Sequence, residues 1–166
     1  IRVEVLVPDF GGDEAALETV LRVQPDVFGH NLETVPRLYA DARPQAGFQR
    51  SLDVLRRAGA AGLVTKTALM LGLGETRADV LQAMRDARRV GCRILYLGQY
   101  LQPTRAHLPV ARYVEPGEFE AFRRDGLAMG FDVVVSAPLV RSSYHSDEQA
   151  AFLASLSRQS AAAPAS

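Results

Sequence analysis

Polar side chains in this sequence gather directly after apolar runs, where a strand would end. The densest group is residues 141–145, which reads Arg-Ser-Ser-Tyr-His. A serine hydrolase is not favoured, because the chain has no G-x-S-x-G turn and Ser143 lies too close to His145 in sequence for a standard triad. The simpler interpretation of these residues is a surface loop in which a serine caps the next helix.

A second polar group, His30 with Asn31 and Glu33, follows an earlier apolar run. A metal site is conceivable, but the spacing matches no common zinc pattern and no second histidine lies nearby in sequence. We therefore expect these side chains to hydrogen-bond a polar ligand or a neighbouring loop.

The turn at residues 70–76 contains two glycines and leads into a helix start. Glycines allow close approach of the backbone to a ligand, and free N–H groups at a helix start can bind an anion, although ordinary turn chemistry explains the same residues. Glu75 either binds an amine or hydroxyl or is a first-turn carboxylate favoured by the helix dipole. Lys66 lies inside an apolar run, so it contacts a ligand or forms a structural ion pair.

Composition limits the remaining chemistry. The 19 basic and 19 acidic residues give a formal net charge of zero, which argues against nucleic acid or an anionic membrane as a partner. No apolar run approaches the roughly 20 residues that span a bilayer, so we expect a soluble, intracellular protein. The single cysteine, Cys92, excludes an internal disulfide or an all-cysteine metal site within these residues, and we expect it in the core.

The elements that would position these groups are strands alternating with helices. Runs rich in β-branched residues predict strands at 2–7, 27–31, 64–71, 93–98 and 132–136. Asp13 and Thr76 are predicted N-caps of two intervening helices, and a third is expected between Pro116 and Gly130. This order indicates an α/β fold with a parallel sheet and outer helices, a partial or complete (βα) barrel. Its active residues would lie at the carboxyl ends of the strands. We expect residues 1–149 to form this barrel part and 150–166 a short helix with a disordered tail.

Several longer strings carry a resemblance. They are VEVLVPDF at 3–10, HNLETVPRL at 30–38, MLGLGET at 70–76, GQYLQP at 98–103, HLPV at 107–110 with RYV at 112–114, GLAMG at 126–130 and PLVRSSYH at 138–145. In this order they resemble the C-terminal part of the lipoyl synthases, which are radical S-adenosylmethionine (SAM) enzymes. Two departures are Thr67-Ala68, where Ser-Gly is common, and Gly11, where a basic residue is common.

The resemblance implies a partial (βα) barrel of radical SAM type, here truncated at the N-terminus, with two [4Fe–4S] clusters and SAM. One cluster cleaves SAM to a 5′-deoxyadenosyl radical, which abstracts hydrogens from an octanoyl chain. The second cluster is dismantled to supply two sulfur atoms. The implied partner is an octanoylated lipoyl carrier domain, of a 2-oxoacid dehydrogenase E2 or the glycine cleavage H protein, in the cytoplasm.

Site residues carry over from the family by position. One serine of the Arg-Ser-Ser-Tyr motif, Ser142 or Ser143, is the implied iron ligand, and a hard oxygen ligand suits a cluster that is dismantled. The expected SAM-binding residues are Asn31, Glu33, Lys66, Gly72, Gly74 and Glu75. The expected substrate or rim residues are Gln99, Tyr100, Gln102, Arg141, Tyr144 and His145.

The cysteine motifs that hold the clusters in this family are absent from these residues, and one cysteine cannot replace them. We therefore do not expect the clusters to assemble on this chain alone, or the chain to be active alone. Two alternatives remain open. One is a non-catalytic remnant or split-protein half that binds a lipoyl carrier domain or a complementary chain. The other is an unrelated βα-barrel lyase that uses Lys66 as a Schiff-base nucleophile.

Overall fold

A single parallel sheet organises the protein in the computed structural model, which describes residues 1–142 and 147–162. Five strands lie in the order of the sequence, and each pairs in parallel with the next. Their bounds are β1 Glu4–Leu6, β2 Val27–Gly29, β3 Val64–Leu71, β4 Ile94–Gln99 and β5 Val133–Ser136. All carboxyl ends therefore lie at one edge of the sheet, which is called the rim below.

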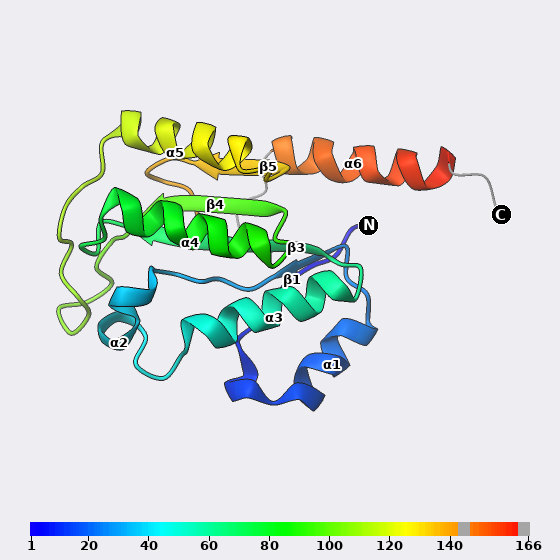
Figure 1. The fold of residues 1–166 in the computed structure, drawn as a ribbon, viewed down its shortest axis with the longest axis horizontal. Helices are drawn as coiled ribbons and strands as arrows, with labels where there is room; N and C mark the ends of the chain where they lie inside the picture. The colour runs from blue at the N-terminus through cyan, green and yellow to red at the C-terminus, as the bar shows by residue number, and fades with distance from the viewer. Residues whose placement is uncertain (143–146, 163–166) are drawn as a thin grey trace.

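Helices lie in the connections between successive strands, and one more helix follows the last strand (Figure 1). Their bounds are η1 Phe10–Gly12, α1 Glu14–Arg22, η2 Pro36–Leu38, α2 Tyr39–Ala42, α3 Phe48–Ala60, α4 Arg77–Arg89, α5 Pro116–Ala128 and α6 Asp147–Ala162. Asp13 caps α1 by accepting hydrogen bonds from the Ala15 and Ala16 amides. Thr76 and Asp79 form a reciprocal capping box at the start of α4. These caps confirm both N-caps predicted from the sequence.

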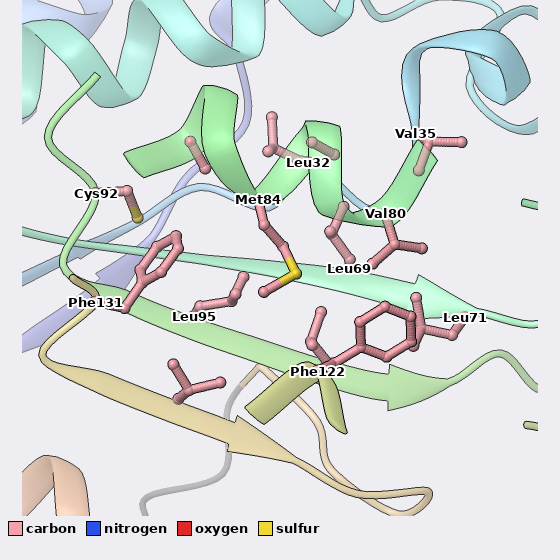
Figure 2. Close-up of a cluster of buried hydrophobic side chains, with 14 of the residues drawn as sticks. Leu32, Val35, Leu69, Leu71, Val80, Met84, Cys92, Leu95, Phe122 and Phe131 are labelled. Carbon is pink, nitrogen blue, oxygen red and sulfur yellow. The ribbon is translucent and has the colours of Figure 1, made fainter. Parts of the chain in front are cut away.

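The main core lies on the face of the sheet that α1, α3, α4 and α5 cover, which is called the outer face below. Alternate residues of β3 and β4, such as Leu69 and Leu95, pack against Met84 of α4 and Phe122 of α5, and all four side chains are at most 2% exposed (Figure 2). A smaller cluster joins α1 and α3 to β1 and β2 around Phe28. Cys92 is fully buried in the main cluster, as expected.

The opposite face of the sheet, called the inner face below, packs against α6. Helix α6 packs Phe152 and Leu153 against Ile94, Tyr96 and Val133. In Figure 1 its C-terminal half extends beyond the sheet. No helix of the described residues is long and apolar enough to cross a membrane.

The α/β fold with a parallel sheet and outer helices, predicted from the sequence, is confirmed and fits a partial radical SAM barrel. Two elements differ from expectation. The sequence patterns singled out no helix at Phe48–Ala60, where α3 lies, since its N-cap Gly47 provides no side-chain cap. Helix α6 spans Asp147–Ala162, so it is longer than the short helix expected within residues 150–166. The division of the chain at residue 149 falls inside this helix and stays a prediction.

Candidate functional site

A pocket of about 170 Å³ opens at the rim, where β3 and β4 and the segments that follow β2 and β5 line it. Five of the residues predicted to be functional line it: Asn31, Glu33, Gln99, Arg141 and Ser142. Its remaining lining is mostly apolar: Ala68, Leu69, Met70, Tyr96, Gly98, Leu101 and Val140. This space, called the rim pocket below, is therefore lined by both polar and apolar side chains.

Asn31 and Glu33 form the polar side of the rim pocket. The chain leaves β2, bulges outward and returns at Glu33, whose amide donates to Ala68 O at 2.9 Å and whose carbonyl accepts from the Met70 amide at 2.7 Å. Glu33 adopts a φ of 65°, which is uncommon for a residue with a side chain. Its carboxylate accepts a hydrogen bond from the Asn31 amide at 3.1 Å, and burial raises the pKa of Glu33. Asn31 Oδ1 is buried and has no hydrogen-bond partner among the described residues.

A second polar hollow of about 250 Å³ adjoins the first and shares Asn31 and Glu33 with it. His30 lines this hollow, and its Nδ1 lies 2.9 Å from the carbonyl of Val7, so the proton is assigned to Nδ1. Nε2 is then an acceptor, and it is buried without a partner in the described structure. Burial lowers the pKa of His30, which favours this neutral form. The hollow thus offers unpaired acceptors.

Arg43 supplies the positive charge of this region. It lines the second hollow, and its guanidinium donates to the carbonyls of Asn31 and Leu32 at 3.2 and 3.4 Å. The sequence patterns did not single it out, because it lies in the connection after α2 and not directly after a strand. Its separation from Asn31 and Leu32 in the sequence matches no pattern that would have predicted these hydrogen bonds.

The Gly72–Glu75 turn is closed on itself. The Glu75 carboxylate accepts hydrogen bonds from the Gly72 and Leu73 amides at 2.7 and 2.9 Å, so these N–H groups are already paired. Gly72 has a φ of 101°, and a Cβ there would collide with Arg112 O and the Gln99 amide. Glycine is therefore required at this position because Arg112 and Gln99 pack closely against it, and not because a ligand does. Neither Gly72, Gly74 nor Glu75 lines the rim pocket, and their binding of SAM stays a prediction.

Three of the expected substrate residues hold the loop after β4. Gln99 accepts from the Val114 amide at 2.9 Å and donates to the carbonyls of Tyr100 and Arg112. The Tyr100 hydroxyl donates to Leu108 O, and the Gln102 amide donates to His107 O. Gln99 also lines the rim pocket, whereas Gln102 is exposed. Substrate contact by these residues is untested.

Lys66 does not reach the rim pocket. Its side chain is on the inner face, 2% exposed, and its Nζ lies 2.8 Å from Glu4 Oε1 and 3.1 Å from Gln149 Oε1. Desolvation lowers the pKa of Lys66, while the Glu4 carboxylate opposes that shift. Of the two interpretations that the sequence left open, the structure shows the ion pair.

The polar stretch at 141–145 is described only in part. Arg141 and Ser142 lie at the rim pocket. Ser143, Tyr144 and His145 lie outside the described residues, so their predicted roles stay predictions.

Comparison with known proteins shows which family the chain resembles. The sequence profile of the Radical SAM superfamily matches residues 1–87, more than half of the 166 residues. The chain belongs to the radical SAM superfamily.

Curated relatives of this radical SAM chain are named lipoyl synthase. The protein of Syntrophotalea carbinolica is 58% identical over 153 residues, which cover 90% of this chain and 50% of the relative. That of Rubrobacter xylanophilus is 55% identical, covering 89% and 46%, and that of Methylococcus capsulatus is 54% identical, covering 92% and 48%. The resemblance to lipoyl synthases is thereby confirmed. The chain spans about half the length of the curated relatives it matches.

The radical SAM family implies SAM and iron–sulfur chemistry, and the two groups fit this chain differently. SAM carries an ammonium, a carboxylate and ribose hydroxyls, which match the unpaired acceptors at His30 and Asn31 and the Arg43 guanidinium. For a cluster, the part of the chain that the structure describes has no group of three or more His, Cys, Asp or Glu side chains placed to hold a metal. Burial raises the pKa of Cys92 to about 12, so it offers no thiolate. The described residues therefore fit SAM and do not fit an iron–sulfur cluster.

Proposed function

We propose that this chain is the SAM-facing and substrate-facing part of a lipoyl synthase, which inserts sulfur at two carbons of a protein-bound octanoyl chain. The observation that carries the proposal is the rim pocket. It joins residues of the family strings from three separate strand ends, 31, 33, 99, 141 and 142, around one mostly apolar space. Such a space suits an alkyl chain that must meet polar chemistry at one end.

In this proposal SAM binds across the mouth of the rim pocket and the adjoining hollow. When bound and reduced by one electron from an iron–sulfur cluster held outside these residues, SAM would supply methionine and a carbon-centred radical able to abstract hydrogen from an unactivated carbon. Asn31 and Glu33 accept hydrogen bonds from its hydroxyl or ammonium groups, and Arg43 pairs with its carboxylate. The raised pKa of Glu33 shows that its charge is poorly solvated in the fold, so a bound cation or hydroxyl would favour the ionised form.

The octanoyl chain enters the apolar part of the same pocket, carried on a lipoyl domain of a 2-oxoacid dehydrogenase E2 or on the glycine cleavage H protein. Ser142 stands at the pocket edge, within reach of a chain bound there. The proposal assigns the iron-binding role to Ser142 or Ser143, and two [4Fe–4S] clusters to the whole enzyme, held by cysteines outside these residues. Such clusters operate in the cytoplasm, where thiols stay reduced.

The geometry does not favour a lyase that uses Lys66 as a Schiff-base nucleophile. A Schiff-base lysine needs a free amine facing its substrate. The Lys66 amine instead donates hydrogen bonds to Glu4 and Gln149. Lys66 is not among the residues that line the rim pocket.

The first test is binding of SAM to this chain, measured by calorimetry. Asn31→Ala and Glu33→Gln are expected to weaken binding about tenfold each, roughly the effect of losing a hydrogen bond to a charged group. The matched control is Asp53→Asn, which removes an exposed carboxylate on α3 from a surface ion pair with Arg56 and should change nothing. Equal affinity in all three variants would refute the assignment of the SAM site.

The decisive test is turnover. The coding sequence upstream of Ile1 is read, and the protein including any cysteine-bearing segment found there is reconstituted without oxygen using iron and sulfide. Lipoyl formation on an octanoylated carrier domain, detected by mass spectrometry, is the expected result. Absence of upstream cysteines, or SAM cleavage without sulfur insertion, would overturn the proposed function.

A further inference from the structure

The rim pocket ends at a defined level of the sheet. Ala68 and Tyr96 are register partners on β3 and β4, and both line the pocket. The next inward-facing pair down the sheet, Lys66 and Ile94, lines none of it. Because side chains on one face recur every second residue, with about 3.3 Å per residue, the pocket stops within one such step. The Tyr96 ring and the Ala68 methyl are therefore its floor.

A buried polar cluster lies directly beneath this floor. The Tyr96 hydroxyl donates to Gln149 Oε1 at 2.7 Å, and Lys66 Nζ lies 4.1 Å from the centroid of the Tyr96 ring. Gln149 Oε1 also accepts from Lys66 at 3.1 Å, and its amide donates to Glu4 Oε2 at 2.7 Å. Tyr96, Lys66 and Gln149 are each at most 2% exposed. A hydrogen bond at one end and a cation against its face hold the ring in one orientation.

Three strands and one helix contribute to the cluster, so it cannot shift without moving the fold. Glu4 comes from β1, Lys66 from β3 and Tyr96 from β4, while Gln149 comes from the first turn of α6. Phe152 and Leu153 of the same helix fill the space beyond. The residues that line the pocket above the floor are also tightly packed, since a Cβ on Gly98 would collide with the Val140 carbonyl.

We propose that Tyr96 determines the length of acyl chain that the rim pocket accepts, and that Gln149 is a positioning residue that holds the Tyr96 ring as the pocket floor. This inference rests on the proposed function, in which an octanoyl chain occupies the pocket. A rigid floor rejects a longer chain by overlap, since closely packed interiors accept extra methylenes poorly. Removal of the ring opens space toward Lys66 and Ile94, which a longer chain can fill.

The test compares octanoyl-lysine and decanoyl-lysine amides. Their binding to the full chain is measured by calorimetry, and their conversion on carrier domains is measured with the reconstituted protein. The unsubstituted protein is expected to prefer octanoyl by about tenfold or more, the scale on which pockets discriminate added methylenes. Tyr96→Ala is expected to reduce that preference about tenfold, whereas Tyr96→Phe, which keeps the ring but loses its hydrogen bond to Gln149, is expected to reduce it only about threefold to fivefold.

Gln149→Met tests the positioning role, because it keeps the side-chain volume and removes every hydrogen bond. We expect a loss of chain-length preference of about threefold to fivefold, with octanoyl affinity itself little changed. The control is Val133→Ala on the same inner face, which creates a cavity but lies at the level of Ile94, outside the pocket. It should lower stability without altering preference.

The outcomes separate the two proposals. If octanoyl carriers are converted but Tyr96→Ala leaves the preference unchanged, the role of Tyr96 is wrong while the proposed function stands. If Val133→Ala changes the preference as much as Gln149→Met does, general destabilisation explains the effect and the positioning role is wrong. If the unsubstituted protein neither binds nor converts either acyl-lysine, both proposals fail.

Discussion

The two faces of the sheet differ in the kinds of side chain that they bury. The outer face is mostly apolar, apart from the buried hydroxyls of Thr65 and Thr67, and four helices, α1, α3, α4 and α5, cover it. The inner face has a smaller apolar cluster, a buried Lys66–Glu4 pair and the rim pocket, and α6 covers only part of it. The outer face can provide most of the folding free energy because it holds the larger clusters of buried apolar side chains. The inner face accepts polar groups that cost free energy to bury, which is expected where a fold holds a ligand.

The largest expected effect follows from the outer face. Phe122, 1% exposed in the main core, should cost about 3–5 kcal/mol of unfolding free energy when changed to Ala. Phe152→Ala on α6 removes a ring that is only partly buried against the inner face, so its cost should be less than half as large. Urea unfolding followed by circular dichroism measures both. Equal costs would mean that the faces contribute alike.

The buried ion pair gives the second prediction. Lys66→Met leaves the Glu4 carboxylate without its cation, although Glu4 is 16% exposed and keeps the Gln149 amide. We expect a loss of about 2–4 kcal/mol, somewhat below the usual cost of breaking a fully buried pair. Adding Glu4→Gln should recover part of this loss, because no unpaired charge remains. A double variant that is no more stable than Lys66→Met would contradict this explanation.

A smaller effect is expected at the edge of the outer layer. Thr76→Ala removes the hydroxyl that accepts from the Asp79 amide at 3.2 Å, and thus half of the capping box of α4. The expected cost is about 1 kcal/mol. Thr76→Ser, measured beside it, should retain nearly all the stability. If both substitutions cost the same, the methyl group and not the cap would be responsible.

How much could be predicted from the sequence also differs between the two faces. Strand β3 was predicted at both of its ends, and the N-cap of α4 was predicted, because both depend on residues close in sequence. The location of the rim groups followed from the parallel order of the strands. The partners of Lys66 could not be predicted, because Glu4 and Gln149 lie 62 and 83 residues away and no local pattern links them.

The rim pocket shows the same limit on a smaller scale. Asn31 and Glu33 were predicted, from their place after a strand, to hydrogen-bond a polar ligand or a neighbouring loop, and the structure brings them together with Gln99, Arg141 and Ser142. Arg43 was missed, because its contact with the Asn31 carbonyl depends on how α2 folds back. The hydrogen bonds within the Gly72–Glu75 turn could not be predicted from the sequence either, because the Glu75 carboxylate can bind a ligand or the amides of its own turn.

The smallest effect predicted here is on pH dependence, and it concerns the inner face alone. Burial raises the pKa of Glu33 above its usual value of 4.5, against the opposing effects of the Asn31 amide and the Arg43 guanidinium. The folded protein therefore binds this proton more tightly than the unfolded chain does. Stability associated with Glu33 is present below pH 4.5 and is lost as the pH rises through the raised pKa.

Glu33→Gln removes this titration while keeping an oxygen for the Asn31 amide. The difference in unfolding free energy between the variant and the unsubstituted protein should grow in favour of the variant as the pH rises from about 4 to 7. Glu14→Gln, the same substitution at an exposed carboxylate on α1, is the matched control for loss of one surface charge. A difference that instead favours the unsubstituted protein at higher pH would mean that Arg43 outweighs burial, and the carboxylate would then be ionised before any ligand arrives.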